Sequence, residues 1–150
     1  MTKDAVDYEI LYTPISLVDG IWPVVNVHIE SALKHSAGEY SLEDILSLIK
    51  SEKMQLWCIG NGEKIIAAYT TQVRNYPQKK TLLVVTLGGK GFFKWGRLME
   101  QSLYKFAKQK HCSHLEILGR KGWARLLGRR ADFKQQYVVL IKEIPHEDTH

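Results

Sequence analysis

The chain has 150 residues, of which 45% are hydrophobic and 25% charged, with a net charge of +5. These values are typical of one globular domain and make a low-complexity chain implausible. No apolar run approaches the roughly 20 residues that span a bilayer, and the polar N-terminus has no signal-peptide pattern. We therefore expect a cytoplasmic protein without a membrane segment, organised as a single domain over residues 1–150. The mild positive charge fits an anionic ligand or partner.

Hydrophobic periodicity and turn residues predict the elements along the chain. In chain order they are a strand at 8–12, a helix from 19 to about 35, a helix from 42, strands at 55–59, 64–74 and 81–87, a helix at 92–110, a strand at 115–118, a short helix at 123–127 and a strand at 136–144. Asp19 is the expected N-cap of the first helix, which places Pro23 in its first turn. Ser41 begins a capping-box pattern, and Asn61-Gly62 predicts a type I′ hairpin turn.

The order of these elements predicts the fold class. The strand at 81–87 is apolar on both faces, so we expect it at the centre of a sheet covered on both sides. Strands that follow one another as hairpins, and then lead into a strand–helix–strand unit, give a mixed, mostly antiparallel sheet. The sequence therefore predicts an α/β (α+β) domain with helices on both faces of that sheet.

A glycine-rich turn joins the central strand to the long helix at 92–110. It reads Gly88-Gly89-Lys90-Gly91 and is followed directly by Phe92. A strand, a glycine turn and a helix N-terminus place backbone N–H groups against a phosphate. The alternative is a glycine turn that connects the two elements and binds nothing.

The order of elements and this turn resemble the GNAT superfamily of acyltransferases. The family pattern Gln/Arg-x-x-Gly-x-Gly/Ala falls on residues 88–93, where Gly91 matches the first glycine. Gly88 replaces the Gln or Arg, Phe93 replaces the small residue, and Lys90 offers a compensating charge. The resemblance implies that acetyl-CoA binds at Val85, Leu87, Gly88, Gly89, Lys90, Gly91, Phe92 and Phe93.

The second family signature, Asn-x-x-Ala-x-x-Leu/Phe-Tyr-x-x-x-Gly-Phe, overlays residues 121–133. Ala124, Leu127 and Phe133 match it, whereas Lys121 and Asp132 replace its Asn and Gly. Gly128 stands where many members of the family have the tyrosine that protonates the departing thiolate. This replacement argues against ordinary GNAT catalysis.

The chain is also similar to compact, divergent GNAT-like proteins encoded in tailed-phage genomes. The shared stretches are Gln55-Leu56-Trp57, Thr70-Thr71, Tyr76-Pro77, Gly88-Gly89, Cys112, Leu115-Glu116-Ile117 and Gly119-Arg120-Lys121-Gly122-Trp123-Ala124-Arg125. This resemblance implies a phage protein located in the host cytoplasm or in the virion.

The family resemblance implies an N-acyltransferase that transfers an acyl group from acetyl-CoA to an unknown amine. Such a transfer needs a base for the amine. Glu116 is the best-placed carboxylate, because it points to the face opposite Leu115 and Ile117, and the alternative is a salt-bridged strand residue. His28, on the apolar side of the first helix, is a second candidate base, with a core histidine as the alternative. Tyr69 and Tyr137 are further candidates that also fit ordinary packing.

A basic cluster follows the last strand of this unit, and its residues are Arg120, Lys121, Trp123, Arg125, Arg129 and Arg130. Arginines with an aromatic residue suit nucleic acid, the phosphates of CoA or an acidic partner, and a solvated basic helix is the plain alternative. The cluster also supports a different class of function. In that alternative, the chain is a non-catalytic GNAT-fold phage protein that is a virion or assembly component or binds and inhibits a host protein.

Metal binding is not predicted. His111, Cys112 and His114 do not follow a structural zinc spacing, and no second ligand pair accompanies them. The two cysteines, Cys58 and Cys112, form no disulfide framework and are expected as small core residues.

Overall fold

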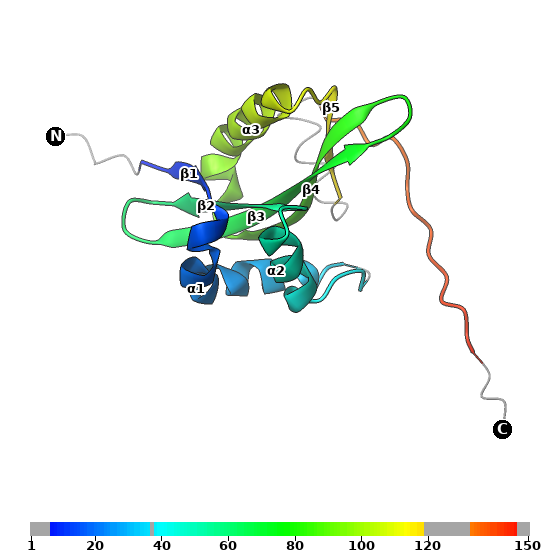
Figure 1. Ribbon diagram of the computed structural model, residues 1–150, viewed down its shortest axis with the longest axis horizontal. Helices are drawn as coiled ribbons and strands as arrows, with labels where there is room; N and C mark the ends of the chain where they lie inside the picture. Colours follow the sequence, from blue (N-terminus) through cyan, green and yellow to red (C-terminus); the bar gives the residue numbers. More distant parts are fainter. Residues whose placement is uncertain (1–6, 37, 119–132, 147–150) are drawn as a thin grey trace. The chain divides into compact units, whose positions relative to one another are not determined.

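The computed structural model describes residues 7–36, 38–118 and 133–146. The chain divides into two compact units, residues 1–120 and 121–150, which are considered separately. The first unit contains the sheet and the helices (Figure 1). Its elements are β1 (Glu9–Tyr12), α1 (Ile15–Leu33), α2 (Leu42–Lys50), β2 (Gln55–Gly60), β3 (Ile65–Asn75), β4 (Lys80–Gly89), α3 (Phe92–Gln109) and β5 (His114–Ile117).

The five strands form one sheet in the order β1-β2-β3-β4-β5. Neighbouring strands are antiparallel except for β4 and β5, which are parallel. The helix α3 covers one face of the sheet, and α1 and α2 cover the other (Figure 1). The predicted fold class, an α+β mixed and mostly antiparallel sheet with helices on both faces, is therefore confirmed.

Each face of the sheet has its own hydrophobic core. On the α3 side, Trp57 and Tyr69 stack with parallel ring planes, and Trp95 and Met99 of α3 are buried in the same cluster. On the other side, Ile29 of α1 and Ile45 of α2 pack in a cluster with residues of β2 and β3. Residues 81–84 of β4 are all buried, which confirms that this strand is covered on both faces, although β3 is the middle strand of the sheet.

The helix α1 begins four residues earlier than predicted. Its N-cap is Pro14, whose carbonyl accepts a hydrogen bond from the Leu17 amide, so the prediction of Asp19 as the cap is wrong. Pro23 therefore lies inside the helix, where it removes one backbone hydrogen bond. The helix continues through Pro23 because Val18 and Val25, on either side of it, are fully buried against the core.

The predicted helix cap at Ser41 and the predicted hairpin turn at Asn61-Gly62 have different outcomes. At α2, Ser41 and Asp44 form the predicted capping box, with each side chain accepting the other residue's backbone N–H. At the β2–β3 turn, only Gly62 has a positive φ, so the type I′ prediction is wrong. The Asn61 side-chain oxygen accepts the N–H groups of Glu63 and Lys64 instead, and this side-chain contact builds a longer loop.

In the second unit, the described residues are 133–146, and they form neither helix nor strand. The predicted strand at 136–144 is therefore wrong. A strand is defined by its ladder of backbone hydrogen bonds, and no neighbouring strand pairs with this segment in the described part of the chain. Leu140 is 90% exposed. The predicted helix at 123–127 lies outside the described residues.

Candidate functional site

The strands β4 and β5 pair over only part of their length. Their register ends at Val84 opposite Ile117, and the last link is a hydrogen bond of 3.4 Å from the Leu118 amide to the Val84 carbonyl. The strand β4 continues for five more residues, to Gly89. Among the described residues, this last part of β4 is paired on the β3 side alone, so its outer edge presents backbone N–H and C=O groups.

A bulge lies where the two strands part. In the β3–β4 register, Thr70 faces Thr86 and Thr71 faces Val84, so Val85 is left without a partner residue in β3. A bulge of this kind bends the strand and increases its twist. The bulge coincides with the point where the pairing of β4 with β5 stops.

Gly88 lies in direct contact with the backbone of α1. A β-carbon at this position would lie 1.9 Å from the His28 carbonyl oxygen, so no other residue fits without moving α1. Gly89 has a φ of +129°, and a β-carbon there would lie 2.3 Å from the Ala67 β-carbon. The first two glycines of the turn are thus required by packing.

The turn ends at the N-terminus of α3. Gly91 is the N-cap with a φ of +79°, and the Lys90 carbonyl accepts a hydrogen bond of 2.8 Å from the Trp95 indole. The N-terminus of an α-helix carries a partial positive charge, and no acidic side chain lies in the first turn of α3. The Phe93 side chain is 66% exposed. These features leave a positive helix end beside Lys90 and Lys94 and suit an anion.

His28 lies on α1, on the face of the sheet opposite α3. Burial lowers the pKa of its imidazole below the usual 6.5, and a hydrogen bond to the backbone of Ile65 partly opposes this shift. The ring is therefore neutral at neutral pH and able to accept a proton. Its catalytic role stays a prediction.

Glu116 lies on β5 opposite Leu83 of β4. Its carboxylate is 3.6 Å from the ammonium group of Lys79, which lies in the turn between β3 and β4. The neighbouring Leu115 and Ile117 pack on the α3-side core, which puts Glu116 on the other face, as expected. This residue is one position before the end of the β4–β5 pairing.

The two candidate bases are not close to each other. His28 contacts Gly88, whereas Glu116 faces Leu83, and five residues of β4 separate these two positions. At about 3.3 Å per residue, the separation along the strand is roughly 16 Å. The structure thus brings His28 to the glycine turn and Glu116 to the end of the β4–β5 pairing.

A threonine pair at the bulge was not expected from the sequence. The hydroxyls of Thr70 and Thr86 are 2.7 Å apart, and both residues are buried. The sequence contained one weak signal for it, since Thr70 and Thr86 each follow a run of apolar residues in their strands. Each hydroxyl is the hydrogen-bond partner of the other, so the pair links β3 to β4 directly beside Val85.

The other residues considered as functional candidates are the two tyrosines, the basic cluster and the metal-ligating side chains. Tyr69 is fully buried in the α3-side core, and Tyr137 is 69% exposed. The basic cluster with Arg120, Trp123, Arg125, Arg129 and Arg130 lies outside the described residues. No group of three metal-ligating side chains occurs in residues 7–36, 38–118 and 133–146.

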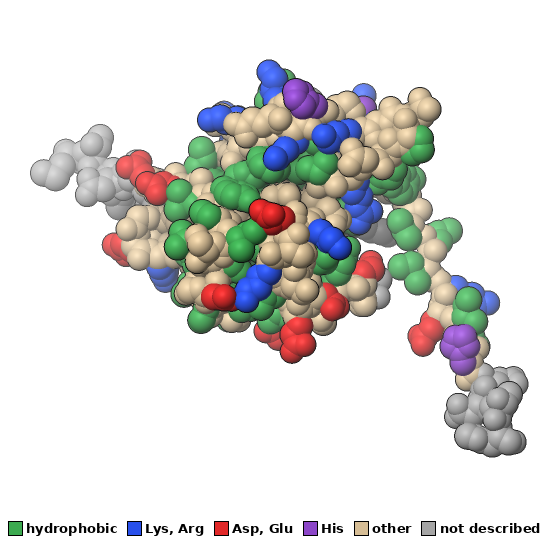
Figure 2. Space-filling view, viewed as in Figure 1, with side chains coloured by type: hydrophobic (Ala, Val, Ile, Leu, Met, Phe, Trp, Pro, Cys, Tyr) green, Lys and Arg blue, Asp and Glu red, His purple; other side chains and the backbone are tan. Residues whose placement is uncertain are grey.

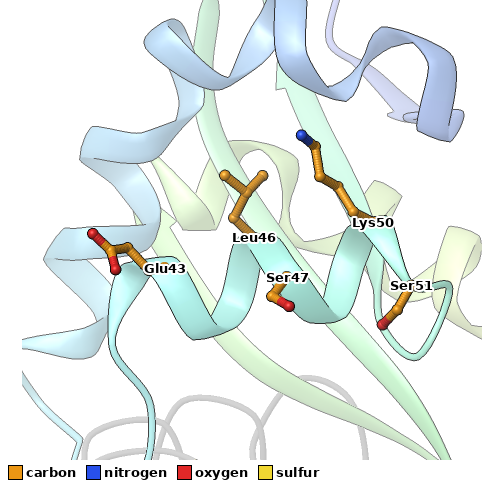
Figure 3. Close-up of a pocket in the computed structure, with 5 residues that line it drawn as sticks. All are labelled: Glu43, Leu46, Ser47, Lys50 and Ser51. Carbon is orange, nitrogen blue, oxygen red and sulfur yellow. The ribbon is translucent and has the colours of Figure 1, made fainter.

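Surface depressions occur elsewhere on the first unit. One of about 480 Å³ lies between β1 and α3 and is lined by residues that include Ile10 and Ser102. Another of about 470 Å³ lies on α2, where Glu43, Leu46 and Lys50 line it (Figure 3). Neither of these is lined by the residues predicted to bind acetyl-CoA. The predicted site is instead an open strand edge and a helix end.

Comparison with known proteins identifies the fold through solved structures. No protein-family model and no curated protein matches the sequence. An aminoglycoside acetyltransferase from an uncultured soil metagenomic sample matches with a TM-score of 0.67 at 13% identity, over 92% of this chain and 97% of that one. A ribosomal-protein-alanine N-acetyltransferase from Brucella melitensis biovar Abortus 2308 matches with a TM-score of 0.67 at 8% identity, over 93% and 100%.

A probable acetyltransferase gives a similar result, with a TM-score of 0.66 at 10% identity over 93% of this chain and 99% of that one. These likenesses define the architecture: the chain has the fold of GNAT acetyltransferases. No helix in the described residues is long and apolar enough to cross a membrane.

Proposed function

We propose that this chain is a GNAT-type N-acyltransferase that uses acetyl-CoA and acts on an amine. The observation that carries the proposal is the free outer edge of β4 beyond Val84, which leads directly into the glycine turn and the N-terminus of α3. An open backbone edge suits an extended amide chain, and a helix N-terminus suits phosphate. The two features are adjacent, as one elongated ligand with an amide arm and a phosphate end requires.

The residues of the turn have separate roles in this proposal. Val85 and Leu87 present the backbone edge of β4, and Gly88 and Gly89 bring that edge close to α1. The positive N-terminus of α3, which follows Gly91, binds phosphate, with Lys90 and Lys94 adding positive charge. When bound, acetyl-CoA supplies an acyl thioester.

The acceptor amine must lose a proton as its nitrogen bonds to the acyl carbon and the carbon–sulfur bond breaks. Glu116 is the proposed base, directly or through a water, because it lies one residue before the point where β4 and β5 part. His28 is the second candidate, since its lowered pKa leaves a neutral imidazole beside the glycine turn. With Gly128 at the usual tyrosine position, the departing thiolate takes its proton from solvent.

Thermal shift with acetyl-CoA tests this proposal. Ligand that binds the native state alone raises the melting temperature by linkage, so wild-type protein should be stabilised by acetyl-CoA and by CoA. Gly91→Trp, which fills the helix end, should abolish the shift. The matched control is Gly38→Trp, another glycine with positive φ, in the loop between α1 and α2, and it should keep the shift. Acetyl transfer that survives Gly91→Trp unchanged would disprove the assigned site.

A second candidate function is a binding protein without catalysis. It is favoured by two observations: the depressions described above lie away from the glycine turn, and the Glu116 carboxylate is already paired with Lys79. The phage origin and the roles in a virion or on a host protein, which the sequence led us to expect, belong to this candidate. It predicts no thermal shift at millimolar acetyl-CoA and recovery of a protein partner instead.

A further inference from the structure

The helix α3 carries a basic stripe on its outer face. Arg97, Gln101, Tyr104 and Lys108 recur at spacings of four, three and four residues, which places them on one side of the helix. Lys105 flanks them. The buried residues of α3, such as Met99 and Leu103, lie on the opposite side. We call these five exposed or half-exposed residues the α3 stripe: Arg97, Gln101, Tyr104, Lys105 and Lys108.

Among the described residues of the first unit, positive charge is concentrated on this layer. Residues 90–111 contain six Lys and Arg against one acidic residue, Glu100. Residues 15–53, which include α1 and α2 on the other face of the sheet, contain six Asp and Glu against three Lys. Lys and Arg side chains gather over α3 in the space-filling view (Figure 2). Within the described residues of the first unit, positive charge is therefore concentrated on the α3 side of the sheet.

Within the described part of the chain, the cations of the stripe have no acidic partner. The ion pairs in the described residues are Lys50–Asp19 and Lys79–Glu116, and neither involves α3. Lys105 and Lys108 are instead three residues apart, where like charges destabilise a helix. A helix face that is simply solvated usually mixes both signs. Lys105 and Lys108 therefore repel each other, and a bound anion would reduce this repulsion.

Tyr104 places an exposed aromatic ring within the stripe. Its side chain is 60% exposed, and the Lys108 ammonium lies over the ring, 5.3 Å from its centroid. A ring that holds a cation over one face can stack on a base through its other face, next to a phosphate-binding charge. This combination is the one that sequence-tolerant proteins use on single-stranded nucleic acid.

We propose that the α3 stripe binds single-stranded nucleic acid. Arg97, Lys105 and Lys108 contact consecutive phosphates, and Tyr104 stacks on a base. From Arg97 to Lys108 the helix rises over eleven residues, or about 16 Å, which is long enough for a short run of nucleotides. The stripe begins beyond the first turn of α3, so this surface is separate from the proposed acetyl-CoA site and does not depend on it.

Fluorescence anisotropy with a labelled oligothymidylate tests the charges. The double variant Lys105→Gln/Lys108→Gln should weaken binding about tenfold and reduce the slope of log K against log salt by about 1.4, because two phosphate contacts are lost. The matched control is Lys34→Gln/Lys53→Gln, which removes the same charge from the opposite layer and should change affinity less than about twofold. Unchanged melting temperatures show that both variants are folded.

Substitution of Tyr104 tests the stacking. Tyr104→Phe should retain binding, whereas Tyr104→Leu should weaken it by about fivefold or more. The proposal is overturned if no oligonucleotide binds at low salt, if both double variants lose affinity equally, or if Lys105→Gln/Lys108→Gln binds as the wild type does. Equal affinity for a duplex together with full binding by Tyr104→Leu would also overturn it.

Discussion

At the scale of single residues, the contact between Gly88 and His28 is central to the proposed site. It fixes the backbone of α1 against β4 and so joins the strand that presents the free edge to the helix that carries a candidate base. The sequence alone indicated a glycine turn at this place. It could not indicate why glycine is required at position 88, because the reason is a contact with a helix sixty residues earlier in the chain.

The substitution Gly88→Ala should be strongly destabilising. The new methyl group would lie 1.9 Å from the His28 carbonyl oxygen, and a backbone atom cannot move aside cheaply. We expect a loss of about 3 kcal/mol or more in the free energy of unfolding, measured by chemical denaturation. Gly20→Ala is the control, since open space surrounds Gly20 on α1, and it should be neutral or stabilising by up to about 1 kcal/mol. Equal effects at the two glycines would contradict the contact.

The pKa of His28 predicts a pH dependence of stability. Burial lowers this pKa, so the unfolded chain takes up the proton before the native protein does as the pH falls. Above the pKa of the unfolded chain, 6.5, His28 is neutral in both states and does not reduce the stability of the fold. As the pH falls from 6.5 towards the native pKa, the unfolded chain binds the proton more tightly, and the free energy of unfolding decreases.

We therefore expect the melting temperature of His28→Gln to fall less than that of the wild type when the pH is lowered from roughly 7.5 to 5. Melting curves at the two pH values for both proteins measure this difference. Parallel losses in wild type and variant would show that the imidazole is not shielded from water in the native protein.

At the scale of elements, local signals were sufficient where local interactions decide the structure. The capping box of Ser41 and Asp44 predicted the start of α2, and the apolar stripe with Trp95 and Met99 predicted α3. The start of α1 was missed because Pro14 caps the helix through its backbone and offers no side-chain signal. The strand at 136–144 was wrong because β-branched composition favours a strand only where another strand pairs with it.

Hydrogen exchange tests the description of this C-terminal segment. Residues 137–144 have no ladder of backbone hydrogen bonds, so their amides should exchange at rates close to those of an unstructured peptide. The amides of β3 serve as internal references, because this strand is the middle strand of the sheet and they should be the slowest. Slow exchange at Val138 or Leu140 would contradict the structure and restore the predicted strand.

At the scale of the whole molecule, the fold was predictable because the order of strands and helices limits the topology. The proposed site was predictable only in part. The glycine turn can be read from the sequence, but the bulge at Val85 and the early end of the β4–β5 pairing cannot, because they depend on which residues face each other across the sheet. At 13% identity or less, the structural neighbours described above share the architecture without fixing the chemistry.

The central claim is that the free edge of β4 and the glycine turn together bind acetyl-CoA. An NMR titration of isotope-labelled protein with acetyl-CoA, followed amide by amide, tests this claim most directly. We expect the largest shifts at Val85, Leu87 and the turn from Gly88 to Phe93, with little change at α2. No shifts at millimolar acetyl-CoA, or shifts confined to the depression on α2 or the groove between β1 and α3, would contradict it.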